Sequence, residues 1–69
     1  MKGVIMKVIV SLYTNDDNGH TQKVMKLKEF KNEENAICYV YAFNVAMKHE
    51  HFEDGSFVIT NDNPYAMID

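Results

Sequence analysis

Five residues of the types that bind transition metals lie within a short stretch of this chain, at His49, Glu50, His51, Glu53 and Asp54. Imidazole and carboxylate groups bind zinc or a similar metal when they converge on one point. On a helix, however, His49 and His51 point roughly 200° apart, and only an extended chain brings them to one side. We therefore predict a solvated helix end here rather than a metal site, and we expect no cofactor.

Other catalytic patterns are weaker still. The run Asn15-Asp16-Asp17-Asn18-Gly19 has part of a calcium-loop composition but lacks the alternating acids and the terminal Glu. Cys38 is the only cysteine, which excludes an intrachain disulfide, and its apolar surroundings predict a packed, unreactive thiol. There is no Ser-His-Asp spacing and no glycine-rich phosphate loop. We predict that the chain is not an enzyme.

The composition is that of a small folded protein. The chain has 69 residues, is 46% hydrophobic and 25% charged, and carries a net charge of −3. We predict a single domain over residues 1–69. The negative charge does not favour non-specific binding to nucleic acid or to an anionic membrane, and no segment has the length of a transmembrane helix. A lone cysteine favours a reducing compartment, so we expect a cytoplasmic protein.

A β-hairpin is predicted over residues 3–14 and 21–30. Apolar residues alternate along the first segment, and Asn18-Gly19 is typical of a two-residue type I′ turn. If that pair forms the loop, Leu12 faces Met25 and Val10 faces Leu27, which places apolar residues together on one face. Lys26 and Lys28 then fall on the other face. The rival interpretation, one continuous helix from His20 onward, is far longer than usual.

A helix is predicted next, from Asn32 to about Phe52. Asn32 is a suitable N-cap, Glu33 and Glu34 suit the first turn, and Gly55 supplies a stop. The apolar residues at helical spacing predict an inward face, made of Ala36, Tyr39, Val40, Phe43, Ala46 and Met47. Because several of these residues also favour strands, the flanking residues decide for a helix.

The remaining residues supply the third strand. Residues 56–60 read as a strand pairing beside the first, and residues 65–69 read as a strand edge or a surface segment. The predicted fold class is α+β, with an antiparallel sheet of a hairpin plus a third strand and one helix packed on one face, in the order β-β-α-β.

Two outer surfaces of this fold remain partly apolar. Ile37 and Tyr41 are left over from the inward helix face, and Tyr13 and Phe30 lie among lysines on the outer sheet face. Contiguous exposed apolar area often marks a contact site, although scattered surface hydrophobics are also normal. The predicted partner-binding residues are Tyr13, Lys26, Lys28, Phe30, Ile37 and Tyr41.

The order of elements, with a hairpin, then "EFKNEENA" entering a helix, then "GSFVIT" as a returning strand, resembles that of small bacteriophage-encoded inhibitors of host machinery. The resemblance implies an interaction protein that covers a surface of a host protein, in the host cytoplasm. Pairing with a second copy is an alternative use of the apolar surface. A further alternative is single-stranded nucleic-acid binding by the lysine and aromatic residues of the sheet; the negative net charge and the absence of arginine disfavour it.

Overall fold

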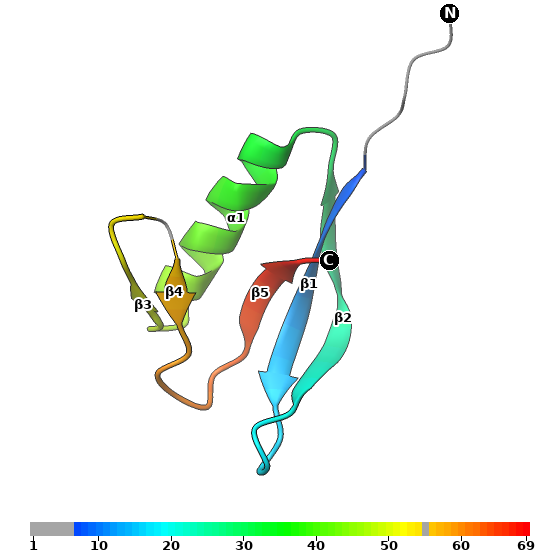
Figure 1. Ribbon diagram of the computed structural model, residues 1–69. Coiled ribbons are helices and arrows are strands. Elements are labelled where there is room, and N and C mark those ends of the chain that lie inside the picture. The colour runs from blue at the N-terminus through cyan, green and yellow to red at the C-terminus, as the bar shows by residue number, and fades with distance from the viewer. Residues whose placement is uncertain (1–6, 55) are drawn as a thin grey trace, which may run out of the picture.

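The structure, a computed structural model, describes residues 7–54 and 56–69 of the chain. There the chain forms one helix, a three-stranded antiparallel sheet and a small second hairpin (Figure 1). The elements in chain order are β1 (Val8–Asn15), β2 (Thr21–Phe30), α1 (Glu33–Ala46), β3 (Glu50–His51), β4 (Phe57–Val58) and β5 (Tyr65–Ile68). The predicted α+β class is confirmed. In the described part of the chain, no helix is long and apolar enough to cross a membrane.

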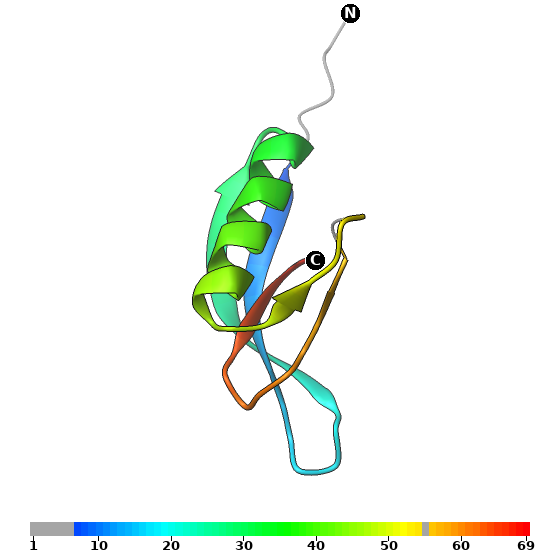
Figure 2. The same cartoon turned by 90° about the vertical axis from the view of Figure 1, so that its left-hand side faces the viewer.

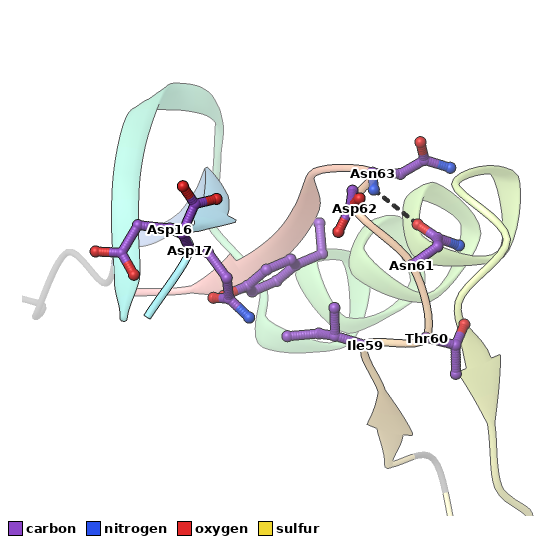
Figure 3. A pocket seen from close by; sticks show the side chains of 9 residues that line it. Asp16, Asp17, Ile59, Thr60, Asn61, Asp62 and Asn63 are labelled. Carbon is purple, nitrogen blue, oxygen red and sulfur yellow. Dashed lines mark hydrogen bonds between the residues drawn. The ribbon is translucent and has the colours of Figure 1, made fainter. Parts of the chain in front are cut away.

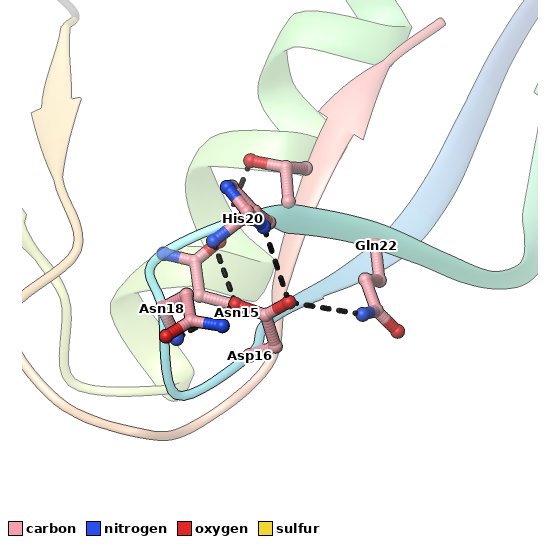
Figure 4. Close-up of polar contacts among 6 residues, drawn as sticks. Asn15, Asp16, Asn18, His20 and Gln22 are labelled. Atoms are coloured by element: carbon pink, nitrogen blue, oxygen red, sulfur yellow. Dashed lines mark hydrogen bonds and ion pairs between the residues drawn. The ribbon is translucent and has the colours of Figure 1, made fainter.

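The hairpin of β1 and β2 is confirmed, but its turn differs from the predicted one. Gly19 has a φ of 81°, and its N–H donates to the Asp16 carbonyl, while the Asp16 N–H donates to the His20 carbonyl. This is a type I turn followed by a left-handed glycine, which forms a three-residue hairpin loop. The Asp16 carboxylate also accepts the N–H groups of Asn18 and His20 (Figure 4). Residues 3–6 of the predicted first strand lie outside the described residues.

Two irregularities in β2 move its pairing out of the predicted register. The pairs pass through three successive registers along the hairpin, Tyr13↔Lys23, then Leu12↔Met25, then Val10↔Lys28. Val24 and Leu27 are the extra residues at the two shifts. Because side chains alternate along a strand, each extra residue exchanges the two faces of β2. The predicted register therefore holds only in the middle of the hairpin.

The shift at Leu27 corrects the predicted lysine face. Lys28 opposes the buried Val10, and Phe30 opposes the buried Val8, so both lie on the face that meets α1. Lys26 opposes Ser11 on the other face. The prediction that Lys26, Lys28 and Phe30 share one outer face is therefore wrong.

The core lies between α1 and the sheet. The buried residues of the hydrophobic cluster come from three elements and are Val8, Val10, Ala36 and Ala66, with Leu27, Phe30, Tyr39, Val40 and Phe43 packed against them. Four of the six residues predicted for the inward helix face are among these. The rings of Phe30 and Tyr39 have their centres 5.5 Å apart. Figure 2 shows α1 lying along one face of the sheet.

Helix α1 begins as predicted and ends earlier. The Asn32 side chain accepts the Asn35 N–H at 3.2 Å, as an N-cap does. At the other end Lys48 has a φ of 68°, its N–H donates to the Val45 carbonyl, and the His49 N–H donates to the Asn44 carbonyl. These are the two hydrogen bonds of a Schellman motif. The predicted continuation to Phe52 is therefore wrong, and the predicted stop at Gly55 lies outside the described residues.

The third strand of the sheet is β5, not the segment that the sequence favoured. β5 pairs antiparallel with β1, with Leu12 opposite Ala66, and gives the strand order β2-β1-β5. The predicted strand over 56–60 is reduced to β4, which pairs with β3 in a separate two-stranded hairpin. The chain thus inserts a hairpin between the helix and the strand that completes the sheet.

Candidate functional site

A polar hollow of about 620 Å³ lies between the β1–β2 turn and the loop that precedes β5. Its polar lining comes from Asn15, Asp16, Asp17, Thr60, Asn61, Asp62 and Asn63 (Figure 3). Two of these polar side chains already form hydrogen bonds with backbone groups of their own loops. Asp16 caps the turn, which lowers its pKa, chiefly through the His20 hydrogen bond, and the Asn61 side chain accepts the Asn63 N–H at 2.7 Å. The arrangement is that of capped turns.

An apolar groove of about 490 Å³ lies on the helix side of the molecule. One wall is α1, with Ile37, Val40 and Tyr41, the opposite wall is the β3–β4 hairpin, and β5 contributes Met67 and Ile68 between them. In Figure 2 the helix and the hairpin stand on either side of β5. The groove volume lies within the range of about 300–1,000 Å³ of ligand-binding pockets. We take this groove as the candidate site.

Two of the predicted partner-binding residues line the groove. Ile37 is 52% exposed and Tyr41 is 51% exposed, as expected for residues left over from the inward helix face. They stand one turn apart on α1, so their side chains form one continuous apolar stripe. Their predicted position on an exposed apolar surface is confirmed, and their role in binding stays a prediction.

His51 forms part of the hairpin wall. Its ring centre lies 4.5 Å from that of Tyr41 and 5.5 Å from that of Phe57. Both imidazole nitrogens are buried, and within residues 7–54 and 56–69 neither has a hydrogen-bond partner. Buried polar atoms are nearly always hydrogen-bonded, and an exception calls for an explanation. The groove wall therefore contains a donor and an acceptor that the described chain does not use.

Asn44 fixes β5 relative to α1, and the sequence did not reveal it. The Asn44 side chain is fully buried. Its carbonyl oxygen accepts the Ala66 N–H at 2.7 Å, and its amide nitrogen donates to the Ala66 carbonyl at 3.0 Å. The amide thus takes the place of a neighbouring strand at that point of β5. The only signal in the sequence is a polar residue on an otherwise apolar stretch of helix.

The remaining predicted residues lie away from the groove. Tyr13 stacks on Tyr65, with ring centres 6.2 Å apart, and its hydroxyl donates to Asp69. Lys26 forms an ion pair with Glu29 at 3.4 Å, Lys28 lies 5.4 Å from the Phe30 ring centre, and Phe30 packs on Tyr39. The structure does not bring these four residues together with Ile37 and Tyr41.

Because α1 ends at Ala46, His49 and His51 do not lie on a helix, and they make separate contacts. The nearly buried His49 accepts the Thr60 N–H at Nδ1, at 3.3 Å, and its Nε2 lies 3.2 Å from the carbonyl oxygens of Asn63 and Pro64. These contacts tie the loop before β5 to the end of α1. In the described ranges, no group of three or more His, Cys, Asp or Glu side chains is placed to hold a metal. Cys38 is exposed, which corrects the predicted packed thiol.

Comparisons of the chain with models of known protein families, with curated proteins and with solved structures found no match.

Proposed function

We propose that this protein is a non-enzymatic interaction module that binds another protein through the apolar groove between α1 and the β3–β4 hairpin. The order of its elements, which resembles that of phage-encoded inhibitors, extends the proposal to the kind of partner: a host protein whose surface is occluded. The observation that carries the proposal is the groove, whose long wall exposes about half of Ile37 and of Tyr41. Burial of apolar and aromatic side chains supplies most of the binding energy at such contacts.

The sheet supports this proposal better than it supports nucleic-acid binding. Single-stranded nucleic acids bind to open surfaces where free cations and aromatic faces alternate. Here Lys23 pairs with Asp69 at 2.8 Å, Lys26 pairs with Glu29, and the Phe30 ring packs on α1. Two of the lysines and the aromatic ring that such a surface needs are thus engaged within the chain.

Affinity capture tests the proposal. The tagged protein is incubated with a host-cell lysate, and stoichiometric partners are identified by mass spectrometry. Ile37→Glu places a charge in the groove wall, where burial against a partner would desolvate it, so we expect at least a tenfold loss of the captured partner. Val24→Glu is the matched control, because Val24 is 54% exposed on β2, away from the groove.

Three results would contradict the proposal. These are no stoichiometric partner for the parent protein, equal loss with both variants, and retention of the partner by Ile37→Glu. Binding to labelled oligonucleotides, measured at several salt concentrations, separates the nucleic-acid alternative. A steep fall of affinity with salt would favour that alternative over a protein partner.

A further inference from the structure

We infer that the groove binds an extended apolar segment of the partner, flanked by basic residues, which adds to the sheet as a strand beside β5. This inference deepens the proposed function and rests on it. Four features support it: the free edge of β5, the shape of the groove, the unpartnered ring nitrogens of His51 and the charges of the groove walls.

The outer edge of β5 is only partly occupied. The Asp69 N–H donates to the Ile9 carbonyl at 2.8 Å on the β1 side. Because backbone groups alternate in direction along a strand, Ala66 and Ile68 turn theirs to the opposite edge. Asn44 binds both groups of Ala66. For Ile68, which is 36% exposed, the described residues supply no such partner, so its N–H and C=O are available to an added strand.

The groove places apolar walls at this free edge. Met67 and Ile68 lie between the side chains of α1 and those of the β3–β4 hairpin. A strand added at β5 runs about 4.8 Å from it and directs alternate side chains to opposite sides. Its inward side chains would meet Ile37 and Tyr41 on α1. Recognition of this type takes affinity from main-chain hydrogen bonds and specificity from pockets for alternate side chains.

His51 supplies a second, independent indication of a ligand at the groove. Its ring is held between Tyr41 and Phe57 with both nitrogens buried and unpartnered in the described chain. Leaving such groups unpaired destabilises the free protein. An incoming backbone brings both N–H and C=O groups, and it would satisfy a nitrogen if the ring turned toward the groove on binding.

The charges around the groove select a basic partner. The two elements that form its walls, residues 33–46 and 50–58, contain five carboxylates and no Lys or Arg: Glu33, Glu34, Glu50, Glu53 and Asp54. Six of the seven lysines lie instead within residues 1–31, and the seventh, Lys48, lies in the link between the two walls. Opposite charges at the rim of an interface raise the association rate and fix the orientation of the partner. Lys or Arg residues at the ends of the apolar segment match this pattern.

A second copy of the chain fits the groove less well than a single strand. The free edge lies between two walls, so the β5 edges of two copies cannot approach to strand spacing without displacing α1 or the β3–β4 hairpin. A lone extended segment enters without that displacement. We therefore commit to a segment of a different protein, and self-association is an outcome of the test.

Synthetic peptides test the inference by fluorescence anisotropy. The probes are dye-labelled heptapeptides with Lys at both ends, Thr at alternate positions, and Val, Ile, Leu or Phe at the positions between. Matched peptides carry either N-methylated central residues or Glu in place of both Lys residues. We expect saturable binding of at least one Lys-flanked peptide, about tenfold weaker after N-methylation because a main-chain donor is lost. We also expect weaker binding with Glu ends, loss with Ile37→Glu, and no change with Val24→Glu.

The failures are distinguishable. Strand addition would be overturned if none of the peptides bound, or if the N-methylated form bound as tightly as its parent peptide. In either case the proposed function would stand if a partner were captured from lysate and lost with Ile37→Glu. A dimer seen by light scattering, and abolished by Ile37→Glu, would overturn the inference in favour of a second copy. Failure of both capture and peptide binding would overturn the proposed function too.

Discussion

Replacing Asn44 should affect this protein more than its position on the helix suggests. Its amide is the only side chain in the described residues that hydrogen-bonds to both backbone groups of Ala66, at 2.7 and 3.0 Å. Ala66 is itself fully buried, so in the parent protein its backbone groups are paired by the amide and not by solvent. Asn44→Ala leaves a donor and an acceptor unsatisfied in the core.

The expected loss follows from those two groups. Each buried backbone group left unpaired costs about 1–3 kcal/mol, and together they cost about 2–6 kcal/mol. A chain of this length is stabilised by roughly 3–10 kcal/mol in total. Asn44→Ala should therefore remove a large fraction of the free energy of unfolding, measured by urea denaturation with circular dichroism. Asn35→Ala is the matched control: that exposed side chain has no hydrogen bond in the described chain, and we expect a change within about 0.5 kcal/mol.

Asn44→Asp gives the same argument a pH dependence. One carboxylate oxygen can accept the Ala66 N–H, but the other then faces the Ala66 carbonyl. Burial and this repulsion raise the pKa of the introduced carboxyl above its unfolded value of about 4. The protonated acid donates to the carbonyl, so its contribution is fully present below the unfolded pKa and is lost as the pH rises through the folded pKa. The deficit relative to the parent protein should shrink in acid.

Two results would refute this reasoning. One is a destabilisation by Asn44→Ala no larger than that by Asn35→Ala. The other is an Asn44→Asp deficit that does not change between pH 4 and pH 8. Amide exchange supplies an independent check, because the Ala66 N–H should be strongly protected in the parent protein and should lose that protection in Asn44→Ala.

Three further predictions concern other parts of the fold. Lys48→Gly should stabilise the protein by about 0.5–1 kcal/mol in urea denaturation, because Lys48 has a φ of 68° and glycine adopts that conformation without strain; Lys48→Ala, which removes the charge only, should not. Gly19→Ala should destabilise the protein by about 1 kcal/mol, because Gly19 has a φ of 81° that alanine adopts only with strain. An added Cβ meets no atom within 4 Å, so this backbone strain is the whole of the expected cost. Hydrogen bonds from Lys23, Tyr13 and Ser11 lower the pKa of Asp69 to about 2. Its contribution to stability is present above its unfolded pKa and is lost as the pH falls from about 4 toward 2. Urea midpoints of Asp69→Asn should depend less on pH over that range, and an unchanged dependence would show that other carboxyls dominate.

Local signals in the sequence predicted the elements that they specify directly. Asn18-Gly19 between alternating segments gave the hairpin, and Asn32 followed by acids gave the start of α1. The register was missed because nothing in the sequence marks Val24 and Leu27 as extra residues. Leu27 packs against the core, whereas Val24 is exposed and no contact among the described residues explains its bulge. The helix end was missed because a lysine in the left-handed region has no sequence signature. The third strand was assigned to the more apolar segment, whereas the amide of Asn44 selects β5.

The candidate site was predicted only in part, for a related reason. Helical spacing alone identifies Ile37 and Tyr41 as left over from the inward face. The opposite wall, with His51 and Phe57, depends on the early end of α1 and on the β3–β4 hairpin, which are tertiary outcomes. Phe30 was assigned from the alternation of the sheet, and the bulge at Leu27 turns it to the helix face. Tyr13 keeps its predicted place on the outer face of β1, but it stacks on Tyr65 and its hydroxyl donates to Asp69, away from the groove.

The two bulges of β2 have a consequence for how molecules of this protein can associate. A three-stranded sheet has two edge strands, each with unpaired backbone N–H and C=O groups. If both edges can pair with another molecule, copies can add one after another into a fibre. In β2 the register changes at Val24 and again at Leu27, and a twisted, lysine-bearing edge is a poor template for a neighbour. If a strand adds at β5 as proposed, the bulged β2 edge at the other side of the sheet would not take up another, so binding would end growth of the sheet instead of extending it.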